Sequence, residues 1–151
     1  MQPYIQRLTK LGIDARALRL PRGAAERAMT SLLEQVGEAL PASVIGGHSY
    51  GGRVASMVAG ERSPAGLVLL SYPLHRPGHP EQLRVDHWPE IECPALVLAG
   101  DRDQFARVDL LQQSVELLGD VQLHIYPGLR HGLQAAAGDV ARRIAEFTRA
   151  L

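Results

Sequence analysis

The chain has 151 residues, of which 46% are hydrophobic and 21% are charged, and sixteen basic side chains balance sixteen acidic ones. This is the composition of a single globular domain, which we expect to span residues 1–151. A formal net charge of zero excludes the basic surface through which proteins bind nucleic acid or anionic lipid. No apolar stretch approaches the roughly eighteen residues of a membrane span, and the one cysteine, Cys93, excludes a disulfide framework. We therefore expect a cytoplasmic protein with neither a nucleic-acid nor a membrane partner.

The first forty residues predict two helices separated by a strand. Residues 2–11 have a helical pattern, and residues 13–20 alternate between polar and apolar side chains, which is typical of a half-exposed edge strand. A second helix is predicted over residues 24–40, because this stretch starts after Pro21, stops before Pro41 and carries an apolar stripe. The stripe consists of Leu32, Leu33, Val36 and Leu40.

Three continuous apolar runs lie in the middle of the chain, at residues 43–46, 67–71 and 95–99, each bounded by glycine or proline. Such runs are typical of parallel strands that are covered on both faces by helices. Helical patterns follow the first and the third run, at residues 53–59 and 108–118. This alternation predicts strand-helix-strand units.

The remaining segments complete the prediction. Residues 72–94 hold five of the ten prolines, so we expect an irregular segment with only a short helix near residues 84–87. Residues 121–126 alternate like an edge strand, and residues 140–151 form an amphipathic helix pattern. The side chains expected to face inward from that strand are Val121, Leu123 and Ile125, and those expected to face outward are Gln122, His124 and Tyr126. The chain is therefore predicted to be an α/β protein with an open, mostly parallel sheet and helices on both faces.

The most informative motif is Gly-Gly-His-Ser-Tyr-Gly-Gly at residues 46–52, which lies between a predicted buried strand and a helix. Gly47, Ser49 and Gly51 match G-x-S-x-G, the pattern of a nucleophilic serine on a strained strand-to-helix turn. Neighbours without side chains are needed two positions away on either side, because a Cβ atom there would collide with the strand or the helix. The backbone N–H of Tyr50 is then a candidate oxyanion donor at the helix N-terminus. A glycine-rich turn used only for close packing is the alternative interpretation.

A serine hydroxyl needs a base, and the base needs a carboxylate that orients it. Asp101 and Asp103 follow the third apolar run, and His131 lies on a glycine-flanked loop after the last predicted strand. We favour Asp103 over Asp101 as the acid, because the extra residues let its carboxylate turn toward the histidine loop while Asp101 caps the turn. The sequence thus predicts a triad of Ser49, Asp103 and His131.

With these motifs the chain resembles the small bacterial α/β-hydrolase-like proteins, which are similar to dienelactone hydrolases and are grouped with a testis-expressed protein and a subunit of the NSL complex. The resemblance is carried by Gly-Gly-His-Ser-Tyr-Gly-Gly-Arg at 46–53, by Leu-Ser-Tyr-Pro-Leu-His-Arg-Pro-Gly at 70–78 with Glu-Gln-Leu-Arg at 81–84, and by Gly-Asp-Arg-Asp at 100–103. It implies the α/β-hydrolase fold, and it maps the acid onto Asp103 and the base onto His131.

The same resemblance implies that strands of the family precede Met1, so that this chain is N-terminally truncated relative to the family. The family's third strand, and the glycine-rich loop that supplies a second oxyanion donor, are then absent. Their absence leaves a slot in the sheet between residues 13–20 and residues 43–46, where unpaired main-chain groups are costly. Three arrangements fill it: direct pairing of these two segments, a strand donated by a second copy in a homo-oligomer, or a natural protein that begins upstream of Met1. We favour the third.

We therefore expect a serine hydrolase that acts on an ester or related acyl bond of a small-molecule substrate, with no cofactor and no metal. The alternative is a weakly active or inactive hydrolase-fold protein that serves in binding or scaffolding, or a fragment that needs upstream residues.

Other residues receive lesser roles. Tyr72 and Leu74, just beyond a strand end, are expected to line the substrate pocket. His48 is expected to pack or to form a hydrogen bond beside the serine turn. His75 and His79 are not expected to bind metal, because a proline and a glycine between them break the helix that such a spacing needs.

Overall fold

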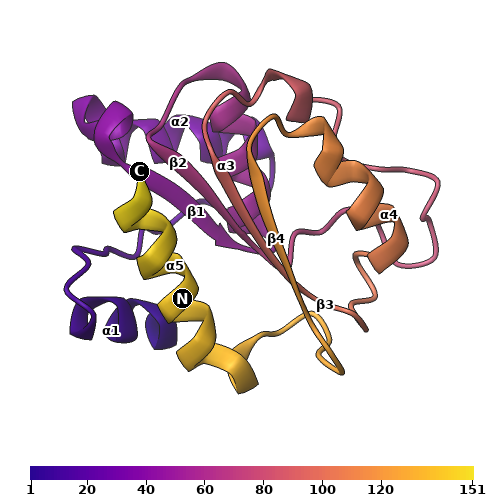
Figure 1. Ribbon diagram of the computed structural model, residues 1–151. Helices are drawn as coiled ribbons and strands as arrows, with labels where there is room; N and C mark the ends of the chain where they lie inside the picture. The colour runs from indigo at the N-terminus through magenta and orange to yellow at the C-terminus, as the bar shows by residue number, and fades with distance from the viewer.

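The protein is built on one parallel β-sheet (Figure 1), and the computed structural model describes all of residues 1–151. The strands are β1 Val44–His48, β2 Gly66–Leu70, β3 Ala95–Gly100 and β4 Val121–Tyr126. They pair in the order β1-β2-β3-β4, and every pair is parallel. The predicted open parallel sheet is confirmed, and because the chain order equals the strand order, each connection carries the chain one strand further across the sheet.

Helices cover both faces of this sheet, as the sequence predicts. Helices α1 (Gln2–Lys10) and α5 (Ala137–Ala150) pack against each other over one face (Figure 1). Helices α2 (Ala25–Val36), α3 (Tyr50–Glu61) and α4 (Val108–Ser114) lie on the other. No helix here is both long enough and apolar enough to cross a lipid bilayer. Short 3-10 turns lie at Gly37–Ala42, Trp88–Glu90, Val115–Leu117 and Gln134–Ala136.

The continuous apolar runs in the sequence follow from this covering on both faces. Leu67 and Leu69 of β2 point into the core under α2 and α3, whereas Val68 and Leu70 point into the core under α1 and α5. All four side chains are buried. Because alternate residues of a strand face opposite sides, a strand in a two-sided core must be apolar at every position.

Two helix predictions and one strand-face prediction need correction. The helix predicted over residues 24–40 ends at Val36 and continues as the 3-10 turn Gly37–Ala42, since Gly37 takes a φ of 58° and Pro41 has no N–H. The helix predicted over residues 108–118 likewise ends at Ser114 and continues as a 3-10 turn. Tyr126, expected to face outward, is buried because α5 covers that end of β4.

The proline-rich segment at residues 72–94 is more buried than its composition predicts. Its short helical turn lies at Trp88–Glu90 rather than near residues 84–87. Tyr72 and Trp88 pack with ring centroids 5.0 Å apart, and neither has exposed surface. The Tyr72 hydroxyl donates a hydrogen bond of 2.6 Å to the carbonyl of Arg84. The buried residues of the segment, among them Tyr72 and Trp88, therefore belong to the hydrophobic core, whereas exposed residues lie both between these two and after Trp88.

The strand predicted at residues 13–20 does not form. This segment is extended, but between Asp14 and Leu18 it makes no main-chain to main-chain hydrogen bond. It does not pair with β1, whose only neighbour in the sheet is β2. The direct pairing of these two segments, one of the three arrangements considered above, is thus absent from this structure. The reason is physical: a strand needs a hydrogen-bonding partner, and none lies within reach of this segment.

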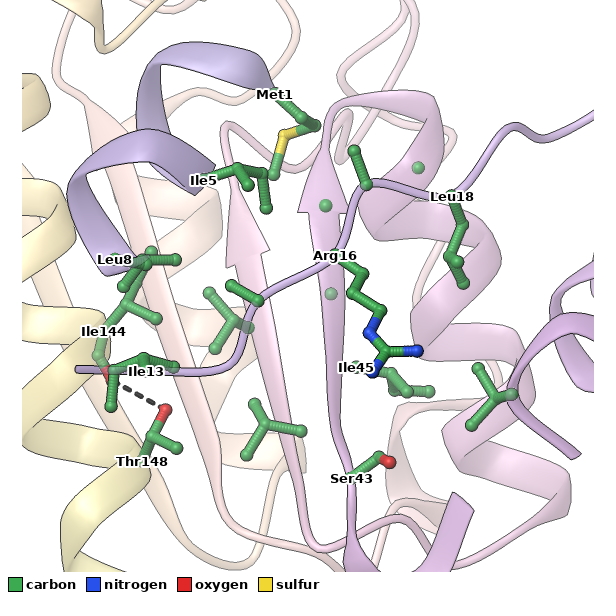
Figure 2. Close-up of a pocket in the computed structure, with 18 of the residues that line it drawn as sticks. Met1, Ile5, Leu8, Ile13, Arg16, Leu18, Ser43, Ile45, Ile144 and Thr148 are labelled. Carbon is green, nitrogen blue, oxygen red and sulfur yellow. Dashed lines mark hydrogen bonds between the residues drawn. The ribbon is translucent and has the colours of Figure 1, made fainter. Parts of the chain in front are cut away.

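Instead, a groove of about 940 Å³ separates residues 13–20 from the outer edge of β1 (Figure 2). Its walls are mostly apolar and include Leu8 of α1, Ile13, Ile45 of β1 and Ile144 of α5. The carbonyl of Ser43 and the N–H of Ser49 both bond toward β2. Alternation along the strand then turns the main-chain groups of the even-numbered residues, namely Val44, Gly46 and His48, toward this groove.

This alternation predicts an exchange pattern within a single strand. In the 151-residue protein, the amides of Val44, Gly46 and His48 should exchange with deuterium at least about tenfold faster than those of Ile45, Gly47 and Ser49, because only the second set bonds to β2. NMR-detected hydrogen exchange measures all six. Equal protection of both sets would mean that the outer edge of β1 is covered in solution.

Candidate active site

Ser49 lies on the turn between β1 and α3, in a backbone conformation that side-chain-bearing residues rarely adopt. Its φ is 52° and its ψ is −117°. The surrounding hydrogen bonds hold this conformation: the Ser49 N–H donates to the carbonyl of Leu70 at 2.9 Å, and the Ser49 carbonyl accepts from Arg53 at 3.0 Å. A non-glycine residue in such a conformation carries strain of about 1–3 kcal/mol, which is stored mostly at functional sites.

The steric argument for glycine beside this serine holds at one of the two predicted positions. A Cβ on Gly47 would lie 2.7 Å from the backbone carbon of Gly51, whereas a Cβ on Gly51 would meet nothing within 4 Å. The second glycine that the turn requires is Gly52, where a Cβ would lie 2.7 Å from the Gly47 carbonyl oxygen. The helix thus approaches the strand through Gly52, one residue later than the motif suggests.

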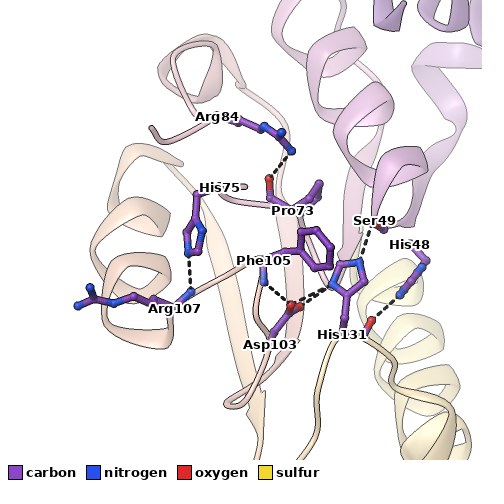
Figure 3. A network of polar contacts seen from close by, with 9 residues as sticks. All are labelled: His48, Ser49, Pro73, His75, Arg84, Asp103, Phe105, Arg107 and His131. Carbon is purple, nitrogen blue, oxygen red and sulfur yellow. Dashed lines mark hydrogen bonds and ion pairs between the residues drawn. The ribbon is translucent and has the colours of Figure 1, made fainter. Parts of the chain in front are cut away.

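A continuous chain of hydrogen bonds joins Ser49, His131 and Asp103 (Figure 3). The Ser49 hydroxyl lies 2.7 Å from Nε2 of His131. On the other side of the ring, Nδ1 of His131 lies 2.8 Å from Oδ2 and 3.0 Å from Oδ1 of Asp103. The structure therefore brings together three residues that are 82 and 28 positions apart in the sequence.

The two aspartates after β3 have different partners. The Asp103 side chain has no exposed surface, and its Oδ1 also accepts a hydrogen bond of 2.8 Å from the N–H of Phe105. Oδ1 of Asp101 accepts a hydrogen bond of 2.7 Å from the N–H of Gly128, on the turn after β4. Asp103 thus contacts the imidazole, while Asp101 caps a turn that leads to it.

Gly100 is a structural requirement of this site that sequence reasoning missed. It ends β3, and a Cβ at this position would lie 2.2 Å from the carbonyl oxygen of Leu129. The same carbonyl accepts a hydrogen bond of 2.9 Å from the N–H of Arg102. The loop that carries Asp103 and the loop that carries His131 therefore cross in direct contact. A glycine at the end of a buried strand, followed by two aspartates, was the signal available in the sequence.

Two further side chains hold the His131 ring. Nε2 of His48 donates a hydrogen bond of 2.7 Å to the His131 carbonyl, and the two rings lie 5.1 Å apart. The Phe105 ring packs against His131 at 4.4 Å. Burial lowers the pKa of His48 below its ordinary value, so the ring is neutral at neutral pH and keeps the proton that it donates. His48 thus lies beside the serine turn as expected, with its polar contact on the backbone of the histidine loop.

Tyr50 is the first residue of α3, where an N–H has no acceptor within the helix. Its hydroxyl donates a hydrogen bond of 3.2 Å to the carbonyl of Pro21. The side chain is therefore anchored outside the site. This leaves the backbone N–H, at the positive end of the helix dipole, free for an anionic oxygen.

The predicted roles of Tyr72 and Leu74 need correction. Both are fully buried in the core under α2 and α3, so neither offers surface to a substrate in this structure. The physical reason is that the segment after β2 turns back onto the sheet instead of rising above its edge. His75 and His79 do not converge either: His75 is buried against Arg107, and His79 is exposed beside Glu81.

The comparisons with known proteins agree with this architecture. A family model described as an alpha/beta hydrolase domain matches residues 3–148. A predicted CIB-like hydrolase from Thermoplasma acidophilum shares the fold with a TM-score of 0.76 at 16% identity, over 99% of this chain and 81% of that one.

Two further structures are similar to a comparable degree. A monoacylglycerol lipase from Paleococcus ferrophilus gives a TM-score of 0.74 at 16% identity, over 96% of this chain and 86% of the lipase. A thermophilic esterase from Thermogutta terrifontis gives 0.73 at 17% identity, over 98% of this chain and 84% of the esterase. At such identities these likenesses establish the fold.

The lowered pKa of His48 predicts a pH dependence of stability. Because the folded protein takes up this proton at a lower pH than the unfolded chain does, the contribution of His48 is complete above its unfolded pKa, near 6.5, and is lost as the pH falls below it. The variant His48→Gln keeps an N–H donor but does not titrate. Its free energy of unfolding, measured with urea at pH 7.5 and pH 5, should fall less on acidification than that of the wild type. An equal fall in both proteins would contradict the assignment.

Proposed function

Because the chain belongs to the alpha/beta hydrolase domain family, we propose that it is a serine hydrolase that cleaves an ester or a related acyl bond of a small molecule. The observation that carries this proposal is the unbroken path of hydrogen bonds from the Ser49 hydroxyl through His131 to the buried Asp103 carboxylate. Each group emerges from the carboxyl end of a different parallel strand, the edge at which α/β proteins bind ligands.

In the proposed first step, Ser49 Oγ attacks the carbonyl carbon of the substrate. Nε2 of His131, at 2.7 Å, takes the hydroxyl proton as the new C–O bond forms. The Asp103 carboxylate accepts the Nδ1–H of His131, which fixes the tautomer with a free lone pair on Nε2 and stabilises the imidazolium that results. The proton then passes from Nε2 to the leaving alcohol or thiol, and an acyl-enzyme remains.

In the second step a water molecule replaces the alcohol. His131 removes a proton from this water, the resulting hydroxide equivalent attacks the acyl-enzyme, and the proton returns to Ser49 as the carboxylic acid leaves. In both steps negative charge develops on the former carbonyl oxygen. The backbone N–H of Tyr50 and the N-terminus of α3 are positioned to stabilise this charge.

The carboxylesterase or thioesterase class is the finer part of the proposal. Two structural neighbours, described as a monoacylglycerol lipase and a thermophilic esterase, act on ester bonds, which supports this class. The partly exposed His131, with 23% of its side chain accessible, supports a site that a small acyl group can reach directly. A panel of short-chain p-nitrophenyl esters and of acyl thioesters distinguishes the two bond types.

A fluorophosphonate probe tests the nucleophile without knowledge of the substrate. The wild-type chain should be labelled covalently at Ser49, and Ser49→Ala should not, because the probe reacts only with a serine whose proton is removed by a base. Ser43→Ala, at the other end of β1, is the matched control and should label like the wild type. A folded protein that never labels, or labels at another serine, would favour a binding or scaffolding role instead.

Substitution of the other two residues tests the relay. His131→Ala and Asp103→Asn should each lower kcat for p-nitrophenyl butyrate by about 10³ or more, with an unchanged circular dichroism spectrum. Asp101→Asn should lower kcat by less than about tenfold, since Asp101 caps a turn and does not touch the imidazole. If Asp101→Asn proved the more damaging change, Asp103 would not be the acid.

A further inference from the structure

His75 is a buried histidine that the proposed reaction does not use. It lies on the segment that leaves β2, and only 3% of its surface is exposed. Two hydrogen bonds fix the start of this segment: Ser71 donates to the carbonyl of Leu98 at 2.8 Å, and Arg84 donates to the carbonyl of Leu74 at 2.9 Å. The main chain that leads to His75 is therefore fixed by hydrogen bonds at the edge of the sheet.

Both the main chain and the side chain of His75 bind the loop that carries Asp103. Figure 3 shows the side-chain bond. The His75 N–H donates to the carbonyl of Phe105 at 3.0 Å. Nε2 of His75 accepts a hydrogen bond of 3.1 Å from the N–H of Arg107. Nδ1 lies 2.8 Å from the carbonyl of Arg76, which can only accept, so the ring proton lies on Nδ1 and Nε2 is left as the acceptor.

This contact matters because of where it lies on the loop. The near half of the loop is anchored by Asp101 and Arg102, whose N–H groups bond to the carbonyls of Tyr126 and Leu129. In the far half of the loop, Phe105 and Arg107 form main-chain hydrogen bonds to only one residue outside the loop and α4, namely His75. Asp103 lies between the two anchored halves.

Phe105 transmits this anchor to the site. Its carbonyl accepts from the main-chain N–H of His75, its N–H donates to Oδ1 of Asp103 at 2.8 Å, and its ring packs on His131, while the next anchor along the loop is the bond from Arg107 to the His75 imidazole. A shift of Phe105 would therefore move the carboxylate and loosen the imidazole together. Displacement of a reacting group by about 1 Å lowers rates by as much as about 10²-fold.

We infer that His75 is a positioning residue: its neutral imidazole accepts from Arg107 and thereby holds residues 103–107 so that the Asp103 carboxylate faces His131. The inference rests on the proposed function for its effect on turnover, but the position of the carboxylate is measurable without a substrate.

Two pairs of variants isolate the hydrogen bond from either side. His75→Leu removes the acceptor, whereas His75→Gln places an amide oxygen where Nε2 lies. Arg107→Pro removes the donor and suits the local φ of −57°, whereas Arg107→Ala keeps the N–H and loses only the surface ion pair with Asp109. We expect His75→Leu and Arg107→Pro to lower kcat for p-nitrophenyl butyrate by about 10- to 100-fold with KM within about threefold. His75→Gln and Arg107→Ala should stay within about threefold of the wild type in both constants.

The second measurement is the low-field proton NMR signal of the Nδ1–H of His131, which reports its hydrogen bond to Asp103. The signal should persist in the wild type, His75→Gln and Arg107→Ala, and should move upfield or vanish in the other two variants. If His75→Leu does not fold, the Arg107 pair carries the test.

The outcomes separate this inference from the proposed function. Absence of Ser49-dependent turnover in the wild type, together with the expected NMR changes, would sink the proposed function and leave His75 as the residue that positions the Asp103–His131 pair. Turnover that depends on Ser49 but is unaffected by His75→Leu and Arg107→Pro would overturn the inference. Equal losses in His75→Leu and His75→Gln would overturn it too, because the acceptor would then not be the cause.

Discussion

The Asp103 carboxylate has no contact with solvent, and the geometry of the site depends on how this charge is satisfied. A buried carboxylate without partners is strongly destabilising, so the fold must deliver donors to it. It receives the N–H of Phe105 from its own loop and Nδ1–H of His131 from another. The requirement to pair one charge thus forces two loops from the carboxyl ends of β3 and β4 to meet, and the imidazole between them can then reach Ser49.

The main-chain hydrogen-bonding groups of the sheet are not equally paired in all strands. The inner strands β2 and β3 each have two neighbours and are covered on both faces, whereas β1 and β4 are edge strands, and the open edge of β1 lies beside an apolar groove. Ser49 lies at the end of that edge strand, and its strained turn is held from the β2 side, by the carbonyl of Leu70. The geometry of the serine turn is therefore supported by the well-packed part of the sheet.

Most of the architecture could be predicted from the sequence because it rests on local patterns. Apolar runs located β1, β2 and β3, and the motif around Ser49 located the turn. What failed depended on partners distant in sequence. Residues 13–20 alternate like a strand but pair with no strand, and the burial of Tyr72 and Leu74 depends on how the chain returns to the sheet. The motif likewise predicted that Gly47 and Gly51 are both required for steric reasons. In the structure the two required glycines are Gly47 and Gly52, because α3 approaches β1 at Gly52.

The crossing of two loops at Gly100 has a consequence for how this site can vary. A methyl group there would lie 2.2 Å from the Leu129 carbonyl oxygen, so the two loops can cross only where residue 100 has no side chain. The length and course of each loop therefore constrain those of the other. Insertions in the aspartate loop and in the histidine loop are then not independent events in the divergence of such chains. Gly100 touches no reactant, yet it tolerates substitution as poorly as the residues that it brings together. Loop grafts between relatives will succeed only when both loops are exchanged as a pair.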